Sequence, residues 1–150
     1  MAQDPVILGY LGRALSLELS AVQQYLSLGR LLTLRGLPQA GDKFRLEAQE
    51  EMEHAERIIG RMLAVGVAPS ASSLRPARLD GSLPELIQHT INLETEIVNF
   101  YAQAVQYCQR AQAHEDRIFF EVLLKEEQQH ATGLHQWWQE MAGDQSLAKK

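Results

Sequence analysis

Two short motifs in this sequence have the residue types and spacing of metal ligands. Glu51 and His54 are three positions apart, and Glu127 and His130 repeat that spacing 76 positions later. Residues three positions apart share one face of an α-helix, so each pair would direct a carboxylate and an imidazole to the same side. A single such pair is more often a surface glutamate beside an incidental histidine. The repetition is what favours a metal site.

Two further glutamates complete the pattern. Glu18 precedes Glu51 by the same interval as Glu94 precedes Glu127. Both lie on stripes that otherwise consist of leucine, valine and tyrosine, which predicts that they face the protein interior. Four buried glutamates would repel one another and lose their hydration, at a large cost in free energy. Protonation would remove that cost, and so would two divalent cations, which cancel four negative charges and use both imidazoles.

This set of residues matches one class of metal centre. Di-iron and di-manganese carboxylate proteins take one glutamate from each of two helices and a Glu-x-x-His motif from each of the other two. Mixed carboxylate and imidazole ligands suit iron or manganese, although copper or zinc could compete for the site. We therefore predict a di-metal centre with six ligands: Glu18, Glu51, His54, Glu94, Glu127 and His130.

Helices are the elements that must position these ligands. Helical periodicity predicts four of them in a single domain over 1–150, at residues 5–35, 38–65, 83–111 and 114–142. Asp4 and Ser82 are expected to cap the first and third helices, and Gly36 to end the first. The short joints at 36–38 and 112–114 predict two antiparallel hairpins.

The long loop at 66–82 decides the topology. Its 17 residues can span ~55 Å when extended, whereas the helices are ~40 Å long. An antiparallel return would need only a few residues, so the second and third helices are predicted to be parallel. The result is an all-α, ferritin-like four-helix bundle with one long crossover. Tyr25 and Tyr101 are separated by the same interval as the two motifs, as are Glu50 and Glu126, which predicts a pseudo-two-fold axis between the hairpins.

The composition excludes several classes of protein. The 150 residues are 45% hydrophobic and 22% charged, which is typical of a globular chain. A net charge of −5 without a basic patch argues against nucleic-acid binding. No apolar run approaches the ~20 residues that span a bilayer, and no signal-peptide pattern begins the chain. The single cysteine, Cys108, allows no intrachain disulfide. We expect a cytoplasmic protein that binds neither nucleic acid nor membrane.

The sequence resembles bacterioferritin from about Ile7 to Met141. The resemblance is most specific in the six ligand residues, in Glu-Met-Glu-His-Ala at 51–55 and in Glu-Glu-x-x-His at 126–130. Tyr25 and Arg30 also match. The resemblance implies an iron-storage protein that forms hollow shells of 24 subunits. Each subunit would hold a di-iron ferroxidase centre, and haem b would lie between paired subunits.

The resemblance also implies roles for the ligands: Glu51 and Glu127 bridging the two irons, Glu18 and His54 on one iron, and Glu94 and His130 on the other. The implied reaction is oxidation of Fe(II) by dioxygen or peroxide, followed by deposition of a ferric mineral in the cavity. The protein contributes by positioning, because two metals ~4 Å apart can share one oxidant.

Two more residues carry roles by the same resemblance. Tyr25 could donate an electron or a hydrogen bond near the centre, or it could be an ordinary core tyrosine. Met52 lies about 100° around the helix from Glu51, so it should face away from the di-metal site. In the family this methionine ligates haem iron, one from each subunit of a dimer. The alternative is a methionine that fills a dimer interface.

The sequence departs from the family at two places. Members with an inner-surface iron site have a histidine and an aspartate where this chain has Leu46 and Glu50, so we expect that site to be weakened. The family has a short fifth helix after the fourth, whereas only residues 143–150 remain here. We expect that helix to be short or absent.

These departures leave alternative functions open. The chain could be a structural or haem-carrying partner subunit of a mixed ferritin shell. It could also be a small di-metal oxidase or peroxidase without storage. The sequence leaves open haem occupancy, the physiological oxidant, the choice between iron and manganese, and a homo-oligomeric or hetero-oligomeric shell.

Overall fold

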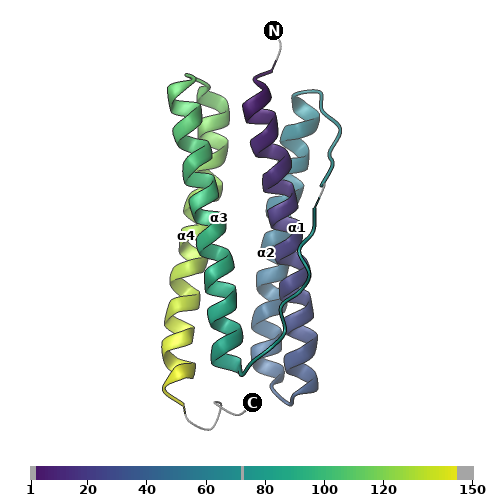
Figure 1. Cartoon of the computed structure of the whole chain (residues 1–150), viewed down its shortest axis with the longest axis vertical. Coiled ribbons are helices and arrows are strands. Elements are labelled where there is room, and N and C mark those ends of the chain that lie inside the picture. The colour runs from purple at the N-terminus through teal and green to yellow at the C-terminus, as the bar shows by residue number, and fades with distance from the viewer. Residues whose placement is uncertain (1–2, 72, 145–150) are drawn as a thin grey trace.

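The computed structural model describes residues 3–71 and 73–144, which form four long helices and contain no strand (Figure 1). The helices are α1 (Pro5–Leu34), α2 (Pro38–Ala64), α3 (Leu83–Arg110) and α4 (His114–Ala142). The predicted all-α four-helix bundle is confirmed. Every helix begins at the residue that periodicity indicated, and the first three end one residue earlier because residues 35, 65 and 111 are their caps.

Local sequence signals define the helix ends. Val6 donates its backbone N–H to Asp4 Oδ1 at 2.8 Å, so Asp4 caps α1. Gly36 has a φ of +81°, the left-handed conformation that ends a helix with little strain only at glycine. Before α3, the backbone N–H and the hydroxyl of Ser82 both donate to Glu85 Oε1, at 3.4 and 3.0 Å.

The connection between the hairpins has the predicted topology. α1 packs mainly against α2, and α3 against α4, each as an antiparallel pair. After α2 the chain runs back along the length of α1 before it enters α3 (Figure 1). α2 and α3 therefore point in the same direction, as the length of residues 66–82 predicted.

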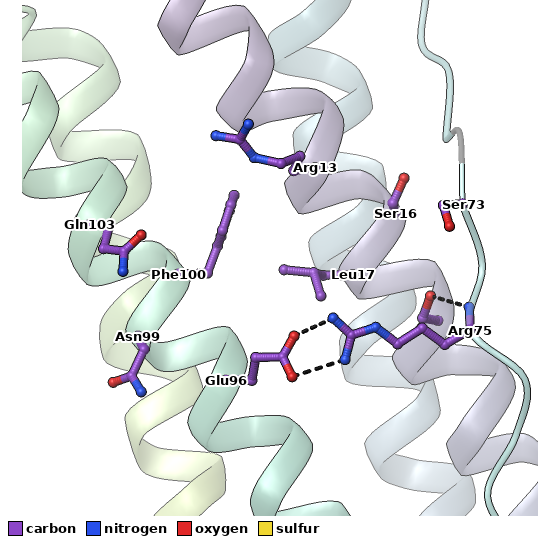
Figure 2. Close-up of a pocket in the computed structure, with 10 residues that line it drawn as sticks. Arg13, Ser16, Leu17, Ser73, Arg75, Glu96, Asn99, Phe100 and Gln103 are labelled. Carbon is purple, nitrogen blue, oxygen red and sulfur yellow. Dashed lines mark hydrogen bonds and ion pairs between the residues drawn. The ribbon is translucent and has the colours of Figure 1, made fainter.

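Polar contacts fix the crossover to the two helices beside it. Gln24 of α1 accepts the backbone N–H of Arg78 at 2.6 Å and donates to its carbonyl at 2.7 Å. Arg75 donates its backbone N–H to Ser20 Oγ at 3.1 Å. The Arg75 guanidinium reaches Glu96 of α3 with two hydrogen bonds (Figure 2). The crossover thus links α1 to α3, the two helices that supply single glutamates to the predicted centre.

Large apolar and aromatic side chains fill the interior of the bundle. The largest of those fully buried are Tyr25, Tyr101, Phe44, Phe120, Leu11, Leu28, Leu32 and Ile58. Helices α1 and α2 approach each other closely at Gly29 and Gly41, where a Cβ added to Gly41 would lie 2.6 Å from the Gly29 carbonyl oxygen. Cys108 is fully buried in this core, where it packs as a small apolar residue.

The helix α1 is apolar enough over an 18-residue window to cross a membrane, judged by length and composition alone. Core helices of globular proteins meet the same criterion. In this structure 44% of that window is buried, and α1 lies in the bundle against α2 and the crossover. It also contributes the charged side chain of Glu18 to the interior. The position of α1 is that of a core helix.

The prediction about a fifth helix lies outside the described residues. α4 ends at Ala142, and Asp144 is the last residue that the structure describes. A short or absent helix at 145–150 therefore stays a prediction.

Candidate metal centre

Four glutamates meet at the middle of the bundle, one from each helix. Glu18 of α1, Glu51 of α2, Glu94 of α3 and Glu127 of α4 are each 0% exposed. Carboxylates at this depth are stable only when they are protonated, paired or bound to cations. The inward stripes inferred from the sequence therefore describe the positions of all four residues correctly.

The two histidines join the glutamates across the bundle. His54 Nδ1 lies 2.7 Å from Glu127 Oε1, and His130 Nδ1 lies 2.9 Å from Glu51 Oε1. Each imidazole thus contacts the glutamate of the other Glu-x-x-His motif. The two rings are nearly parallel, with their centroids 5.8 Å apart and their planes inclined by 12°.

The ligand atoms fall into two groups, and in each group they lie within 4.8 Å of one another. One group consists of Glu18, Glu51, His54 and Glu127, and the other of Glu47, Glu51, Glu94 and His130. The structure brings together all six residues predicted from the sequence. Glu127 belongs to the first group alone, although its Oε2 lies 3.6 Å from His130 Nδ1. That these residues bind metal stays a prediction.

Glu47 is the member that sequence reasoning missed. It lies one helical turn before Glu51 on α2, and its Oε2 is 3.7 Å from His130 Nδ1. That oxygen is buried and has no hydrogen-bond partner among the described residues. Burial raises the pKa of Glu47 from 4.5 to about 7, against the opposing charge of His130. In the sequence, Glu47 lies on the same helix face as Glu51 and His54, and this position was the signal that could have identified it.

Unsatisfied oxygens surround the centre. Within the described part of the chain, one oxygen of each central glutamate is buried without a hydrogen-bond partner: Oε2 of Glu18, Glu51, Glu94 and Glu127. Native proteins leave few buried polar atoms unpaired, so four in one place call for a ligand that supplies positive charge to all of them. Two divalent cations fit that requirement, and the donor set fits iron or manganese.

Protons balance part of the charge in the metal-free centre. Burial raises the pKa of Glu94 well above 4.5, and it also raises the pKa values of Glu18 and Glu51. Burial alone would lower the pKa of each histidine. Hydrogen bonds to the carboxylates outweigh it, led by those to Glu127, and raise the pKa values of His54 and His130 to about 12 and about 11. A metal that binds here must displace these protons.

Two tyrosines contact the glutamates of the opposite hairpin. The Tyr25 hydroxyl of α1 donates to Glu94 Oε1. The Tyr101 hydroxyl of α3 donates to Glu18 Oε1 at 2.7 Å. Tyr25 was predicted near the centre, whereas Tyr101 was assigned no function. Its position as the repeat partner of Tyr25 was the signal that could have identified it.

Comparison with known proteins places this chain in a family. A family model described as a ferritin-like domain matches residues 8–143. The bacterioferritin of Rhodobacter capsulatus is 32% identical over 130 residues, which cover 87% of this chain and 81% of that protein. This chain belongs to the bacterioferritin family. A bacterial ferritin of Synechocystis is 29% identical over 132 residues, which cover 87% of this chain and 85% of that protein.

A solved bacterioferritin shares the whole fold. The structure of the Rhodobacter capsulatus protein superposes with a TM-score of 0.89 and 30% identity, over 95% of this chain and 89% of that one. That protein has a metal-free dinuclear site and a haem iron in a crystallographic special position. A dinuclear site therefore occurs in a close structural relative within the bacterioferritin family.

The predicted haem ligand of the bacterioferritin pattern lies apart from the centre. Met52 is 42% exposed and belongs to neither group of ligand atoms, in agreement with its position around the helix. Leu46 is also exposed on α2, where the family's inner-surface site would need a histidine. The remaining histidines at 89, 114 and 135 lie outside both groups.

Proposed function

We propose that this chain is an iron-storage subunit that binds two Fe(II) ions at its centre and oxidises them with dioxygen or peroxide. The observation that carries the proposal is the set of four buried carboxylates, each with one oxygen unpaired among the described residues. The names of its relatives favour iron over manganese, since they are bacterioferritins and a bacterial ferritin.

Each ligand has a part in the proposed reaction. Glu51 and Glu127 would lie between the two ions. Glu18 and His54 would hold one ion, and Glu94 and His130 the other. The imidazoles lose the protons that they hold in the metal-free protein when Fe(II) binds. Two Fe(II) ions supply two electrons, which with two protons reduce one dioxygen to hydrogen peroxide, or one peroxide to two waters.

The structure of the assembly belongs to the same proposal. Bacterioferritins form shells of 24 subunits, and we extend that state to this chain, in the cytoplasm, with the ferric mineral inside. The match over most of the length of its relatives supports the extension. Haem b would be held by Met52, whose exposed position on α2 suits a ligand shared between two subunits.

One observation favours a second candidate. Leu46 is 60% exposed on α2, and by the sequence resemblance it occupies the position where members with an inner-surface iron site have a histidine. A chain without that site could oxidise iron at the centre and store little of it. A di-metal oxidase without storage would retain the six ligands and lack the shell.

Anaerobic titration with Fe(II) tests the proposed chemistry. We expect two Fe(II) ions to bind per chain, and oxygen then to produce a transient absorbance of oxidised iron. Glu127→Ala should abolish that absorbance, whereas Glu56→Ala, an exposed control on α2, should retain it. Unchanged oxidation in Glu127→Ala would contradict the proposal.

Light scattering separates storage from oxidation alone. A shell of 16.9 kDa chains would have a mass of about 400 kDa. A species of about 34 kDa alone would contradict storage, because two such chains cannot enclose a mineral. It would leave the oxidase as the function.

A further inference from the structure

The carboxylates of Glu18 and Glu94 are each held by a tyrosine from the opposite hairpin. Tyr25 of α1 donates to Glu94 of α3, and Tyr101 of α3 donates to Glu18 of α1. The two hydrogen bonds therefore cross the same α1–α3 interface in opposite directions. The two hydrogen bonds are equivalent under the pseudo-two-fold axis that relates the two halves of the centre.

The tyrosine rings are fixed by matching aromatic neighbours. Tyr25 packs against Phe44, with ring centroids 6.2 Å apart, and Tyr101 packs against Phe120, with centroids 6.1 Å apart. Phe44 and Phe120 are themselves repeat partners, separated by the same interval as the two tyrosines. Phe100 contacts Tyr101 from another side, at 5.6 Å. Both tyrosines are 0% exposed, so neither ring can turn without opening the core.

The direction of the hydrogen bond determines what Tyr101 can do. A neutral phenol donates its single proton to a carboxylate, and Glu18 Oε1 receives it at 2.7 Å. Glu18 Oε2 is left as the buried oxygen without a hydrogen-bond partner in the described residues. It lies 3.6 Å from His54 Nδ1, on the side of the metal ligands. The tyrosine thus selects which oxygen of Glu18 is available to a metal.

We propose that Tyr101 is a positioning residue that orients Glu18 as a metal ligand, as Tyr25 orients Glu94. The inference rests on the proposed function, because it concerns the same di-metal centre. Groups that hydrogen-bond to metal ligands typically change metal affinity by 10- to 100-fold when they are removed. Loss of the Tyr101 hydroxyl should therefore weaken the ion bound by Glu18 and His54, and leave the other ion bound as before.

Anaerobic titration of the full chain with Co(II) tests the inference through a spectroscopic signature. Wild type should bind two Co(II) ions per chain. Tyr101→Phe should bind one of them about 10- to 100-fold more weakly, with a changed d–d absorption spectrum for that ion. Tyr25→Phe should weaken the other ion instead.

Tyr107→Phe is the matched control. Tyr107 lies on the same helix, α3, and donates to a carboxylate at 2.7 Å, but its partner is Asp4, at the start of α1. This variant should bind both ions with the wild-type affinity and spectrum. Any general effect of removing a hydroxyl from α3 would appear here too.

Background variants assign the effect to one ion. In His54→Ala, whose remaining ion would be held on the His130 side, adding Tyr101→Phe should cause no further loss of affinity. Adding Tyr25→Phe to the same background should weaken the remaining ion. Equal further losses from both tyrosine variants would overturn the assignment of Tyr101 to Glu18.

Two outcomes of the titration separate the inference from the proposed function. Two Co(II) ions bound to Tyr101→Phe with wild-type affinity and spectrum would overturn the inference alone. Absence of Co(II) binding in wild type would overturn the di-metal centre itself. Should Tyr101→Phe fail to fold, Zn(II) added to Tyr25→Phe provides the test. A changed tyrosine ultraviolet absorption would support the role of Tyr101, and an unchanged spectrum would overturn it.

Discussion

The two halves of the candidate metal centre have matching predicted ligands and different surroundings. His54 is buried, with a side chain 2% exposed, and its Nε2 faces Glu126 at 3.6 Å. Arg57 holds Glu126 with two hydrogen bonds of 2.9 Å, which close this side of the centre. His130 is 14% exposed, and its Nε2 contacts Glu50, a carboxylate that is 53% exposed. The His130 half is therefore the more open of the two.

Two substitutions within the repeat account for the difference. The repeat partner of Arg57 is Gly133, so no guanidinium holds Glu50 from the equivalent place. The repeat partner of Glu47 is Leu123, which is buried and apolar. The His130 half thus gains a carboxylate and lacks an arginine. The predicted ligands are therefore repeated in both halves, whereas the residues that control access to them are not.

The largest expected effect comes from Glu51, the residue that belongs to both groups of ligand atoms. Glu51→Ala removes a ligand from both groups, so we expect Fe(II) oxidation to fall about 10³-fold, the equivalent of several kcal/mol of lost metal-dependent stabilisation. Glu18→Ala should affect one half and retain binding of one ion. Stopped-flow oxidation and anaerobic titration measure the two effects. Equal losses in the two variants would contradict the division into halves.

Acid should weaken metal binding in both halves. The pKa values of His54 and His130 are raised to about 12 and about 11 by their carboxylate neighbours, so both imidazoles are protonated at neutral pH. For each proton that the metal displaces, the affinity for the metal should fall about tenfold for every unit by which the pH is lowered below those values. Calorimetric titration with Zn(II) at pH 6, 7 and 8 should show this slope, with proton uptake by the buffer. Affinity that is independent of pH would show that the imidazoles bind no proton in the metal-free protein.

Removing the Arg57 side chain should open the His54 half, so that both halves lose metal at similar rates. Arg57→Gly copies the residue at 133 and releases Glu126, so we expect the ion beside His54 to leave about tenfold faster. Removal of Co(II) by a chelator should show a slow and a fast phase in wild type and nearly equal rates in the variant. The control is Arg61→Gly, because Arg61 also links α2 to α4, through Asp116 at 2.8 Å. If Co(II) still leaves Arg57→Gly in the same slow and fast phases as wild type, access does not distinguish the two halves.

The smallest expected effect concerns the extra carboxylate of the open half. Burial raises the folded-state pKa of Glu47 from 4.5 to about 7. Its contribution to the stability of the metal-free protein is thus present below pH 4.5 and lost as the pH rises through about 7. In Glu47→Leu, which copies Leu123, the free energy of unfolding should fall by about 1 kcal/mol less over this pH range than in wild type. The effect is this small because the Glu47 side chain is a quarter exposed and partly screened. Urea unfolding at pH 4.5 and 7.5 measures it, with Glu56→Leu as the control. A decline as steep in Glu47→Leu as in wild type would contradict the assignment.

The sequence was sufficient for the helices and for the burial of the four glutamates, whereas ligation of metal by the six residues stays a prediction. Helix faces follow from residue spacing, and the length of residues 66–82 favoured a parallel arrangement of the second and third helices. Glu47 could not be found from the repeat because its equivalent position holds Leu123. Tyr101 had a repeat partner, but its role depends on Glu18, which is distant in the sequence and lies on another helix. The His54 half is closed because the long Arg57 side chain of α2 reaches Glu126 of α4. Helical periodicity does not determine such a contact.

Anomalous diffraction at the iron edge from crystals soaked anaerobically in Fe(II) tests the central claim most directly. The account predicts two iron peaks about 4 Å apart. Both should lie between Glu51 and Glu127, with one peak beside His54 and the other beside His130. Iron bound only at the surface, or no peak among the four buried glutamates, would contradict it.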